Sequence, residues 1–509
     1  MKRAFSLFLC IALVLSLFAG CSGEETPGTT GDNGLFEPET EATKPTQPAE
    51  DAPQKICLAY DPEDSFNPYQ TTGHTNRVLF SLIYQGLFTV DADYEAKPML
   101  CQSYNISADK KTYTFHLADA NFSDGTAVTA ADVSASLKAA QESPWYGGRL
   151  QHVTSIGHYG DAVVLELDTP MENLPILLDI PVVKAGQVNA EKPIGTGPYQ
   201  FVGNKLQRQA AWWCEVTLPF DCDTVDLISG ESTAAIRDAF EFDDVTLVLT
   251  DPSAPDYVSF HNDYELWDCE NGLFLYLVCN PDHGVFANEE LRTNLTHAID
   301  RDSLVSAYYN DFAYSATLPA SPQFAYYSGS LANNFGYDPD KFQKAVDAAQ
   351  LELMEISLLV NGGNALRVKV AKTIAKALEG YGFTVKLEQA TGDDYAYLLA
   401  KGDFDLFLGQ TRLSANMDLS AFFGTNSPLS YGGLSDPATY ATCLEALADG
   451  NNYYSLYEMI MNEGRLCPIL FQSFAIYARR GALTGFAPSR DNIFYYDLGT
   501  TLADALMKE

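Results

Sequence analysis

One stretch decides the fold, EISLLVNGGNALRVKVAKTIAKALEGYGFTVKL, which runs from Glu355 to Leu387. Its first six residues, Glu355–Val360, are almost continuously apolar, as in a strand buried on both faces. Apolar residues then recur at helical spacing as far as the glycines at 380 and 382, and Phe383–Leu387 alternates as a second strand. A third strand is predicted at Phe404–Leu408. The pattern is strand, helix, strand, and it predicts a parallel sheet of the α/β class.

Ligands of open α/β sheets bind beyond the carboxyl ends of the strands. The two ends here lead into residues 361–364 and 409–418. Arg412 can grip a carboxylate as a bidentate fork, or it can pair with protein groups in a loop, as can Asp418, and the sequence leaves both interpretations open. The candidate ligand-binding residues at these ends are Asn361, Asn364, Gln410, Arg412, Asn416 and Asp418.

The first residues have the features of an export signal. Met1-Lys2-Arg3 precedes an apolar run from Ala4 to Phe18 that is too short to span a membrane in the mature protein. Leu17–Cys21 (LFAGC) resembles the bacterial lipobox, in which the cysteine is lipidated. We therefore expect a lipoprotein signal peptide over 1–20 and lipidation of Cys21. The protein is predicted to sit on the cell membrane, lipid-anchored on the extracytoplasmic face, in a Gram-positive-type bacterium.

Residues 21–55 are rich in Thr, Glu, Pro and Gly and almost devoid of apolar side chains. Such a segment cannot bury enough surface to offset the entropy of ordering, so it is predicted to be a disordered linker. The remaining chain of about 455 residues is too long for one hydrophobic core, and two or more domains are expected. The formal charge of −36 argues against nucleic acid and against a polybasic membrane patch, since both require clustered Lys and Arg.

Eight cysteines follow the linker, and none forms a CxxC pair. In an exported chain, Cys214 with Cys222 and Cys269 with Cys279 are candidates for disulfides because they are close in sequence. Buried free thiols are an equally good interpretation, since several of these cysteines lie in apolar runs.

A second motif lies between Lys97 and Val133. Thr112–Leu117 alternates as a strand, Ser123-Asp124-Gly125-Thr126 forms a turn, and Thr129-Ala130-Ala131-Asp132 caps a helix. Together with KPML at 97–100, this region resembles the signature of the family 5 extracellular solute-binding proteins, the peptide-, dipeptide- and nickel-binding receptors of ABC importers. Further segments resemble the family in the same order: IYQGLF (83–88), IGTGPY (194–199), 286–305, YDPDK (337–341) and GDFD (402–405).

The resemblance implies a two-lobed periplasmic-binding-protein-like fold of type II, in the large cluster, with a hinged cleft. Lobe I would comprise 56–90, 193–271 and 474–509, with an extra subdomain inserted at 91–192. Lobe II would comprise 272–473, so the chain would cross between the lobes near Gly272 and Phe474.

The resemblance also implies function. The chain would be a receptor that binds dipeptides or oligopeptides in the interlobe cleft and delivers them to ABC permease subunits, as a monomer without a cofactor. The segment Tyr60–Tyr69 resembles one that lines the cleft in the family, so Asn67 and Tyr69, together with Trp267, are predicted to line it here. Peptide-binding relatives commonly carry a DYPDP-like motif where this chain has residues 409–418, and Asn416 or Asp418 could replace its ammonium-binding acid. The departure leaves open a nickel chelate or another small solute as the ligand.

A secreted cell-surface hydrolase is the rival class. Gly230–Ala234 (GESTA) is similar to a nucleophile elbow but ends in Ala, and we interpret it as a surface loop. The seven histidines show no HExxH motif and no metal-ligand spacing. The sequence therefore predicts a binding protein and not an enzyme.

Overall fold

The structure is a computed structural model that describes residues 55–214, 216–261 and 263–499. The predicted signal peptide, lipidated Cys21 and nearly all of the linker lie outside the described residues. The helices are α1 (Phe80–Ile83), α2 (Ala130–Gln141), α3 (Thr233–Glu241), α4 (Glu289–Asn294), α5 (Arg301–Tyr308), α6 (Gly329–Ala332), α7 (Pro339–Ala349), α8 (Ala365–Glu379), α9 (Gly392–Lys401), α10 (Ser420–Phe423), α11 (Pro437–Ala448) and α12 (Tyr453–Glu463).

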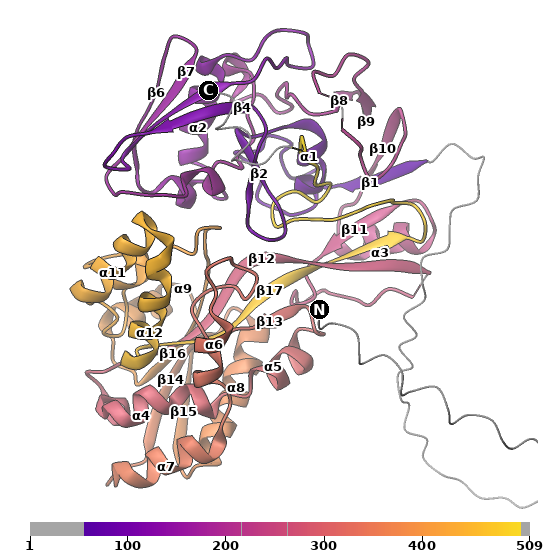
Figure 1. Ribbon diagram of the computed structural model, residues 1–509. Coiled ribbons are helices and arrows are strands. Elements are labelled where there is room, and N and C mark those ends of the chain that lie inside the picture. Colours follow the sequence, from indigo (N-terminus) through magenta and orange to yellow (C-terminus); the bar gives the residue numbers. More distant parts are fainter. Residues whose placement is uncertain (1–54, 215, 262, 500–509) are drawn as a thin grey trace, which may run out of the picture. The chain divides into compact units, whose positions relative to one another are not determined.

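The main sheet is formed by β1 (Ile56–Tyr60), β8 (Tyr199–Val202), β9 (Lys205–Arg208), β10 (Thr224–Ser229), β11 (Leu247–Thr250), β12 (Tyr264–Cys279), β13 (Ala313–Ser315), β14 (Glu355–Asn361), β15 (Thr384–Ala390), β16 (Leu406–Arg412) and β17 (Leu466–Arg479). In the described residues their order is β15-β14-β16-β12-β17-β11-β1-β10-β9-β8, and β13 pairs with β17. Figure 1 shows β12 and β17 running side by side between the α8 end of the sheet and the β1 end.

The predicted strand–helix–strand unit is confirmed. β14 pairs in parallel with both β15 and β16, and α8 connects β14 to β15. The helix begins after Asn364, whose side chain accepts a hydrogen bond from the amide of Arg367 at 2.8 Å and so caps the first turn. Its buried residues, among them Val370, Ile374 and Leu378, pack with β14 and β16 in one hydrophobic cluster. Each such side chain contributes about 1.5–3 kcal/mol on burial.

The end of β16 differs from the prediction. Residues 409–412 were expected to follow the strand, but they form its last four positions, because β16 pairs antiparallel with β12 as far as Leu273 opposite Arg412. Gln410 and Arg412 therefore lie two positions apart on one strand and face the same side of the sheet.

The long strand β12 is irregular at its middle. Its pairing with β17 shifts register between Glu270 and Phe274, and Gly272 in this bulge has φ +75°. The positive φ favours glycine here, and an added Cβ would displace the guanidinium group of Arg490. The predicted crossing points, Gly272 and Phe474, lie within β12 and β17, and the domain limits themselves stay a prediction.

A second sheet of four antiparallel strands has the order β4-β5-β7-β6. Its strands are β4 (Cys101–Ile106), β5 (Thr112–Leu117), β6 (Val153–Tyr159) and β7 (Ala162–Leu167), and a separate pair joins β2 (Phe88–Val90) to β3 (Ala96–Pro98). The predicted strand at 112–117 is β5. The predicted cap is also confirmed, since Thr129 and Asp132 form a reciprocal capping box at the start of α2.

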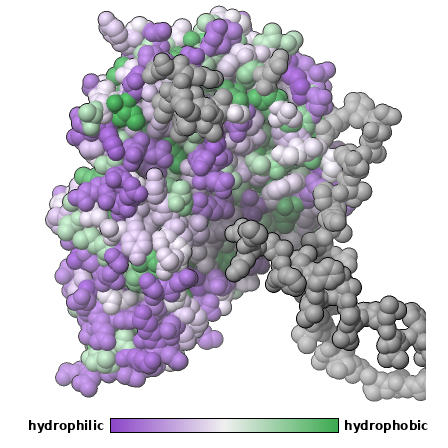
Figure 2. Space-filling model, in the orientation of Figure 1, coloured by the Kyte–Doolittle hydropathy of each residue, from purple (hydrophilic) through white to green (hydrophobic). Residues whose placement is uncertain are grey.

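The eight cysteines of the described residues are all free thiols, and six of them are buried. The candidate pairs Cys214/Cys222 and Cys269/Cys279 are therefore not bridged in this structure. Within the same residues, no helix combines the length and apolar character that a membrane crossing needs. Hydrophilic residues predominate on the face shown in Figure 2, with hydrophobic residues in scattered patches.

Candidate functional site

The ends of β14 and β16 bring three predicted residues into one neighbourhood. Asn361 ends β14 and accepts the amide of Gly363 at 2.9 Å, while Asn364 caps α8. The amide oxygen of Gln410 on β16 accepts a hydrogen bond from Nη2 of Arg367. Arg367 thus connects the first turn of α8 to the neighbouring strand end.

Arg367 is a residue that the sequence analysis missed. Its Nε is buried and has no hydrogen-bond partner among the described residues, and its electrostatic neighbours are Tyr276, Tyr309 and Tyr395 rather than a carboxylate. Burial lowers the pKa of this guanidinium. Arg367 lies in the first turn of α8, three residues after the capping Asn364 and just beyond the end of β14. This position is the sequence signal that would have identified it.

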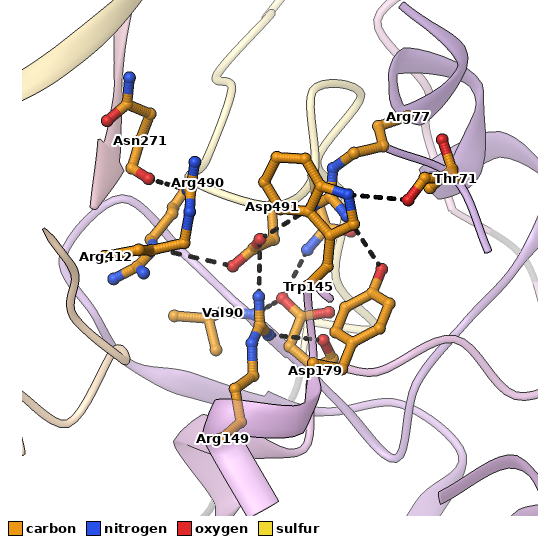
Figure 3. A network of polar contacts seen from close by, with 12 residues as sticks. Thr71, Arg77, Val90, Trp145, Arg149, Asp179, Asn271, Arg412, Arg490 and Asp491 are labelled. Atoms are coloured by element: carbon orange, nitrogen blue, oxygen red, sulfur yellow. Dashed lines mark hydrogen bonds and ion pairs between the residues drawn. The ribbon is translucent and has the colours of Figure 1, made fainter. Parts of the chain in front are cut away.

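Four arginines from distant parts of the chain meet around Asp491 (Figure 3). Two of them, Arg77 and Arg149, come from 3₁₀ turns at Asn76–Leu79 and Gly147–Leu150. Their Nη2 atoms lie 3.2 and 2.7 Å from Oδ1 of Asp491. The surrounding guanidinium groups hold the pKa of Asp491 far below its usual range despite burial.

The other two arginines of the cluster, Arg412 and Arg490, donate to main-chain carbonyls. Arg412 Nη1 donates to Asn271 O, and Arg490 Nη2 donates to Leu413 O. Arg490 Nε is 3.9 Å from Asp491 Oδ2, which is too long for a hydrogen bond. Burial and the neighbouring Arg490 and Arg77 lower the pKa of Arg412 to about 9.

Trp145 separates two of these arginines. The guanidinium carbon of Arg77 lies 4.1 Å and that of Arg412 4.7 Å from the indole ring, whose N–H donates to Thr71 O at 3.0 Å. The edge of His74 packs against the same ring. This cation–π contact and the Asn271 carbonyl are the partners that the structure gives Arg412.

Asp418 lies away from the arginines, against the segment before β6. Its Oδ2 accepts from Gln151 Nε2 at 2.6 Å and faces His152 Nε2 at 3.0 Å, and its Oδ1 accepts the amide of Ser420. His152 Nδ1 faces Asp168 at 3.0 Å. These carboxylates raise the pKa of His152, although burial alone would lower it.

Asn416 lines a small cavity together with aromatic residues. Its side-chain oxygen accepts from Ser414, and its carbonyl accepts from the hydroxyl of Tyr453. The other residues around the cavity are Met171, Glu172, Asn173, Phe324, Tyr326, Ala446, Leu447 and Gly450.

The three residues predicted to line the cleft from the first lobe all contact other parts of the protein. Asn67 is fully buried, and its amide donates to the carbonyls of Val188 and Ala190. The hydroxyl of Tyr69 donates to Pro181 O at 2.6 Å. The half-buried Trp267 packs edge-on against Phe486 at 4.9 Å. Their role in ligand binding stays a prediction.

Gly230–Ser232, in the segment that is similar to a nucleophile elbow, form a short loop with Glu231 and Ser232 exposed, as expected. The loop connects β10 directly to α3, which begins at Thr233. Ser232 is the N-cap of α3, and its hydroxyl accepts the amide of Ala235 at 3.2 Å. Within the described residues, no group of three or more His, Cys, Asp or Glu side chains is arranged to hold a metal ion.

The described residues form a mixed α/β fold that matches the fold of type II periplasmic binding proteins. Residues 95–430 match the model of the family "Bacterial extracellular solute-binding proteins, family 5 Middle". The chain belongs to this family. Family 5 members are solute-binding transport receptors and not enzymes, in agreement with the prediction.

Among curated relatives, the chain is 26% identical over 308 residues to the glutathione-binding protein GsiB of Escherichia coli O1:K1 / APEC, a match that covers 56% of this chain and 59% of the relative. The match thus spans less than two thirds of the length of this curated relative. Among solved structures, it is similar to the ABC transporter substrate-binding protein CtaP of Listeria monocytogenes, with TM-score 0.70, 19% identity and coverage of 88% and 98%. It is also similar to a nickel ABC transporter protein of Bacillus halodurans, with TM-score 0.71, 17% identity and coverage of 87% and 99%.

Proposed function

We propose that this protein is the extracytoplasmic receptor of an ABC importer, which binds dipeptides or oligopeptides between its two lobes and delivers them to a membrane permease. A lipid on Cys21 and the linker up to residue 55 would keep it beside that permease. The family supports the receptor role, and the glutathione-binding relative supports a small peptide as the ligand. Contacts of one ligand with both lobes would make the closed arrangement the better binder, so ligand would shift the equilibrium toward it.

The observation that carries the proposal is the state of Arg367. A half-buried guanidinium whose Nε is shielded from solvent and unpaired is costly, and a carboxylate that reaches it forms charge-assisted, bidentate hydrogen bonds. Every unmodified peptide ends in such a carboxylate. Gln410 holds the guanidinium at the carboxyl end of the strands, where ligands of α/β sheets bind.

The test compares free and amidated peptides by isothermal titration calorimetry. Wild-type protein is expected to bind a panel of di- and tripeptides, and replacement of the terminal carboxylate by an amide should weaken binding about 10- to 100-fold, as the loss of a charged hydrogen bond does. Arg367→Gln should show the same loss for the free peptides and little difference between free and amidated ones. Lys369→Gln, an exposed position on the same helix, is the matched control and should leave affinity unchanged.

Two outcomes would contradict the proposal. One is the absence of binding for every peptide of the panel. The other is cleavage of the peptides during incubation, detected by mass spectrometry, which would favour the hydrolase.

A further inference from the structure

The arginines around Asp491 carry more positive charge than the structure balances. Arg77 and Arg149 both donate to Asp491, which is one carboxylate for two guanidinium groups. Arg412 and Arg490 donate their hydrogen bonds to main-chain carbonyls, and Arg490 has only a distant ion pair with the same Asp491, at 3.9 Å. A guanidinium group remains charged in a protein, so the excess positive charge of this cluster is energetically costly unless an anion binds to it.

Two further acids lie near the cluster and do not remove the excess. The carboxylate of Asp179 accepts from the amide of Val90 and from Asn492, and burial together with the nearby Asp491 raises its pKa to about 7. Glu270 is buried and accepts hydrogen bonds from Tyr94 and Ser321, and burial raises its pKa as well. Even with both acids fully ionised, three carboxylates face four guanidinium groups.

The unbalanced charge is accompanied by unused hydrogen-bond donors. Nε and Nη1 of Arg490 are buried and have no hydrogen-bond partner in the part of the chain that the structure describes, while its side chain is only 7% exposed. Arg490 is held in place by the Leu413 carbonyl and by the space that Gly272 leaves open. Two adjacent donors on one rigid fork match the two oxygens of a carboxylate or of a phosphate.

We propose that Arg490 and Arg412 form a second anion subsite, which receives an acidic group of the transported solute in addition to the carboxylate at Arg367. This inference rests on the proposed function. It names the substrate class as acidic peptides, with a carboxylate or phosphate on a side chain.

The strand places Gln410, the partner of Arg367, and Arg412 on one face of the sheet. They lie two residues apart on β16, so their Cα atoms are about 7 Å apart. A peptide with an acidic side chain on its last residue, or on the residue before it, likewise presents two carboxylates close together. The substrate class is therefore best represented by a dipeptide such as Ala-Glu.

The experiment measures the affinities of Ala-Glu and Ala-Gln, which differ in one charge, for four forms of the full-length protein. Wild type should prefer Ala-Glu at least 10-fold. Arg490→Gln and Arg412→Gln should each reduce that preference to less than 3-fold. Arg480→Gln, which removes a half-exposed arginine paired with Asp263, should retain the full preference.

Inorganic phosphate alone is the probe that separates this inference from the peptide proposal. Titrated in a thermal-shift assay, it should stabilise the wild type and the Arg480→Gln protein by several degrees and leave the other two variants unaffected. Stabilisation by phosphate without binding of any peptide would refute the peptide proposal and support the subsite. The inference is overturned when neither the Ala-Glu preference nor the phosphate stabilisation is larger in wild type than in both Arg490→Gln and Arg412→Gln.

Discussion

His152 and Asp418 are predicted to stabilise the protein in a pH-dependent way. Both ring nitrogens of His152 face carboxylates at 3.0 Å, Nδ1 toward Asp168 and Nε2 toward Asp418. Only the imidazolium has two N–H donors, so the neutral ring satisfies one of these carboxylates and not the other. The hydrogen bond with Asp418 is well protected, because the side chains are 12% and 2% exposed.

The size of the effect follows from this burial. A hydrogen bond to a charged group contributes about 1.5–3 kcal/mol to stability, and little solvent screening reduces it here. The contribution of His152, whose pKa is raised above 6.5, is fully present below that value and is lost as the pH rises through its folded-state pKa. The contribution of Asp418, whose pKa is lowered from 3.8, is present above that value and is lost as the pH falls further. The coupling should therefore be largest between about pH 4.5 and 6.5.

A double-mutant cycle with His152→Gln and Asp418→Asn measures the coupling, using the free energy of unfolding in urea at pH 6 and at pH 9.5. We expect about 1.5–3 kcal/mol at pH 6 and less than half of that at pH 9.5. The control cycle is His283→Gln with Asp403→Asn. These side chains are 38% and 51% exposed, so solvent screens their interaction and their coupling should be well below that of His152 with Asp418. A His152–Asp418 coupling that is equal at both pH values, or no larger than the control, would refute the reasoning.

Three further changes test other parts of the structure. Gly272→Ala should lower the free energy of unfolding by about 1–3 kcal/mol, because φ is positive and the methyl group meets Arg490. The control Gly157→Ala, with open space around it, should change the free energy of unfolding by less than about 0.5 kcal/mol. Equal effects would show that the bulge tolerates a side chain. Arg301→Lys should lower the free energy of unfolding in urea by about 2–4 kcal/mol, since a lysine cannot reach the carbonyls of Ala316 and Pro468 and the other acceptors of this buried guanidinium together. An unchanged free energy of unfolding would mean that these hydrogen bonds contribute little to stability. Cys21→Ser should move the protein from the membrane fraction to the soluble fraction with unchanged ligand affinity, and retention in the membrane would count against lipidation.

Local elements were predictable from the sequence because their causes are local. The periodicity after Glu355 predicted β14, α8 and β15 with small errors at their ends, and Thr129 with Asp132 predicted a helix cap that depends on four consecutive residues. The end of β16 was wrong because its last residues are held by pairing with β12, more than 130 positions earlier in the chain. Polar residues at a strand end look the same in sequence whether or not another strand lies beside them.

The contacts of the candidate site have no local signature. The distance along the chain is 266 residues between His152 and Asp418 and 414 residues between Arg77 and Asp491. Asn67 was predicted to line the cleft because its segment resembles one that does so in the family, and no sequence pattern shows that its amide donates to carbonyls more than 120 residues away. Sequence alone can propose which polar residues lie near a strand end, but which of them keep free donors is decided by partners that only the fold brings together.

The net charge of the chain does not predict the charge of its ligand, because the local charge at a site also depends on which residues the fold brings together. The formal charge of −36 is the sum over the whole chain, and the field of an exposed carboxylate is screened over about 8 Å at physiological ionic strength. The side chain of Arg490 is only 7% exposed and Arg412 is half-buried, and fields between groups shielded from solvent are screened far less. A bound anion would therefore feel these two arginines much more strongly than the acidic surface. An acidic protein with a cationic interior is consistent with selection of an acidic solute at the site and repulsion of polyanions such as nucleic acid at the surface.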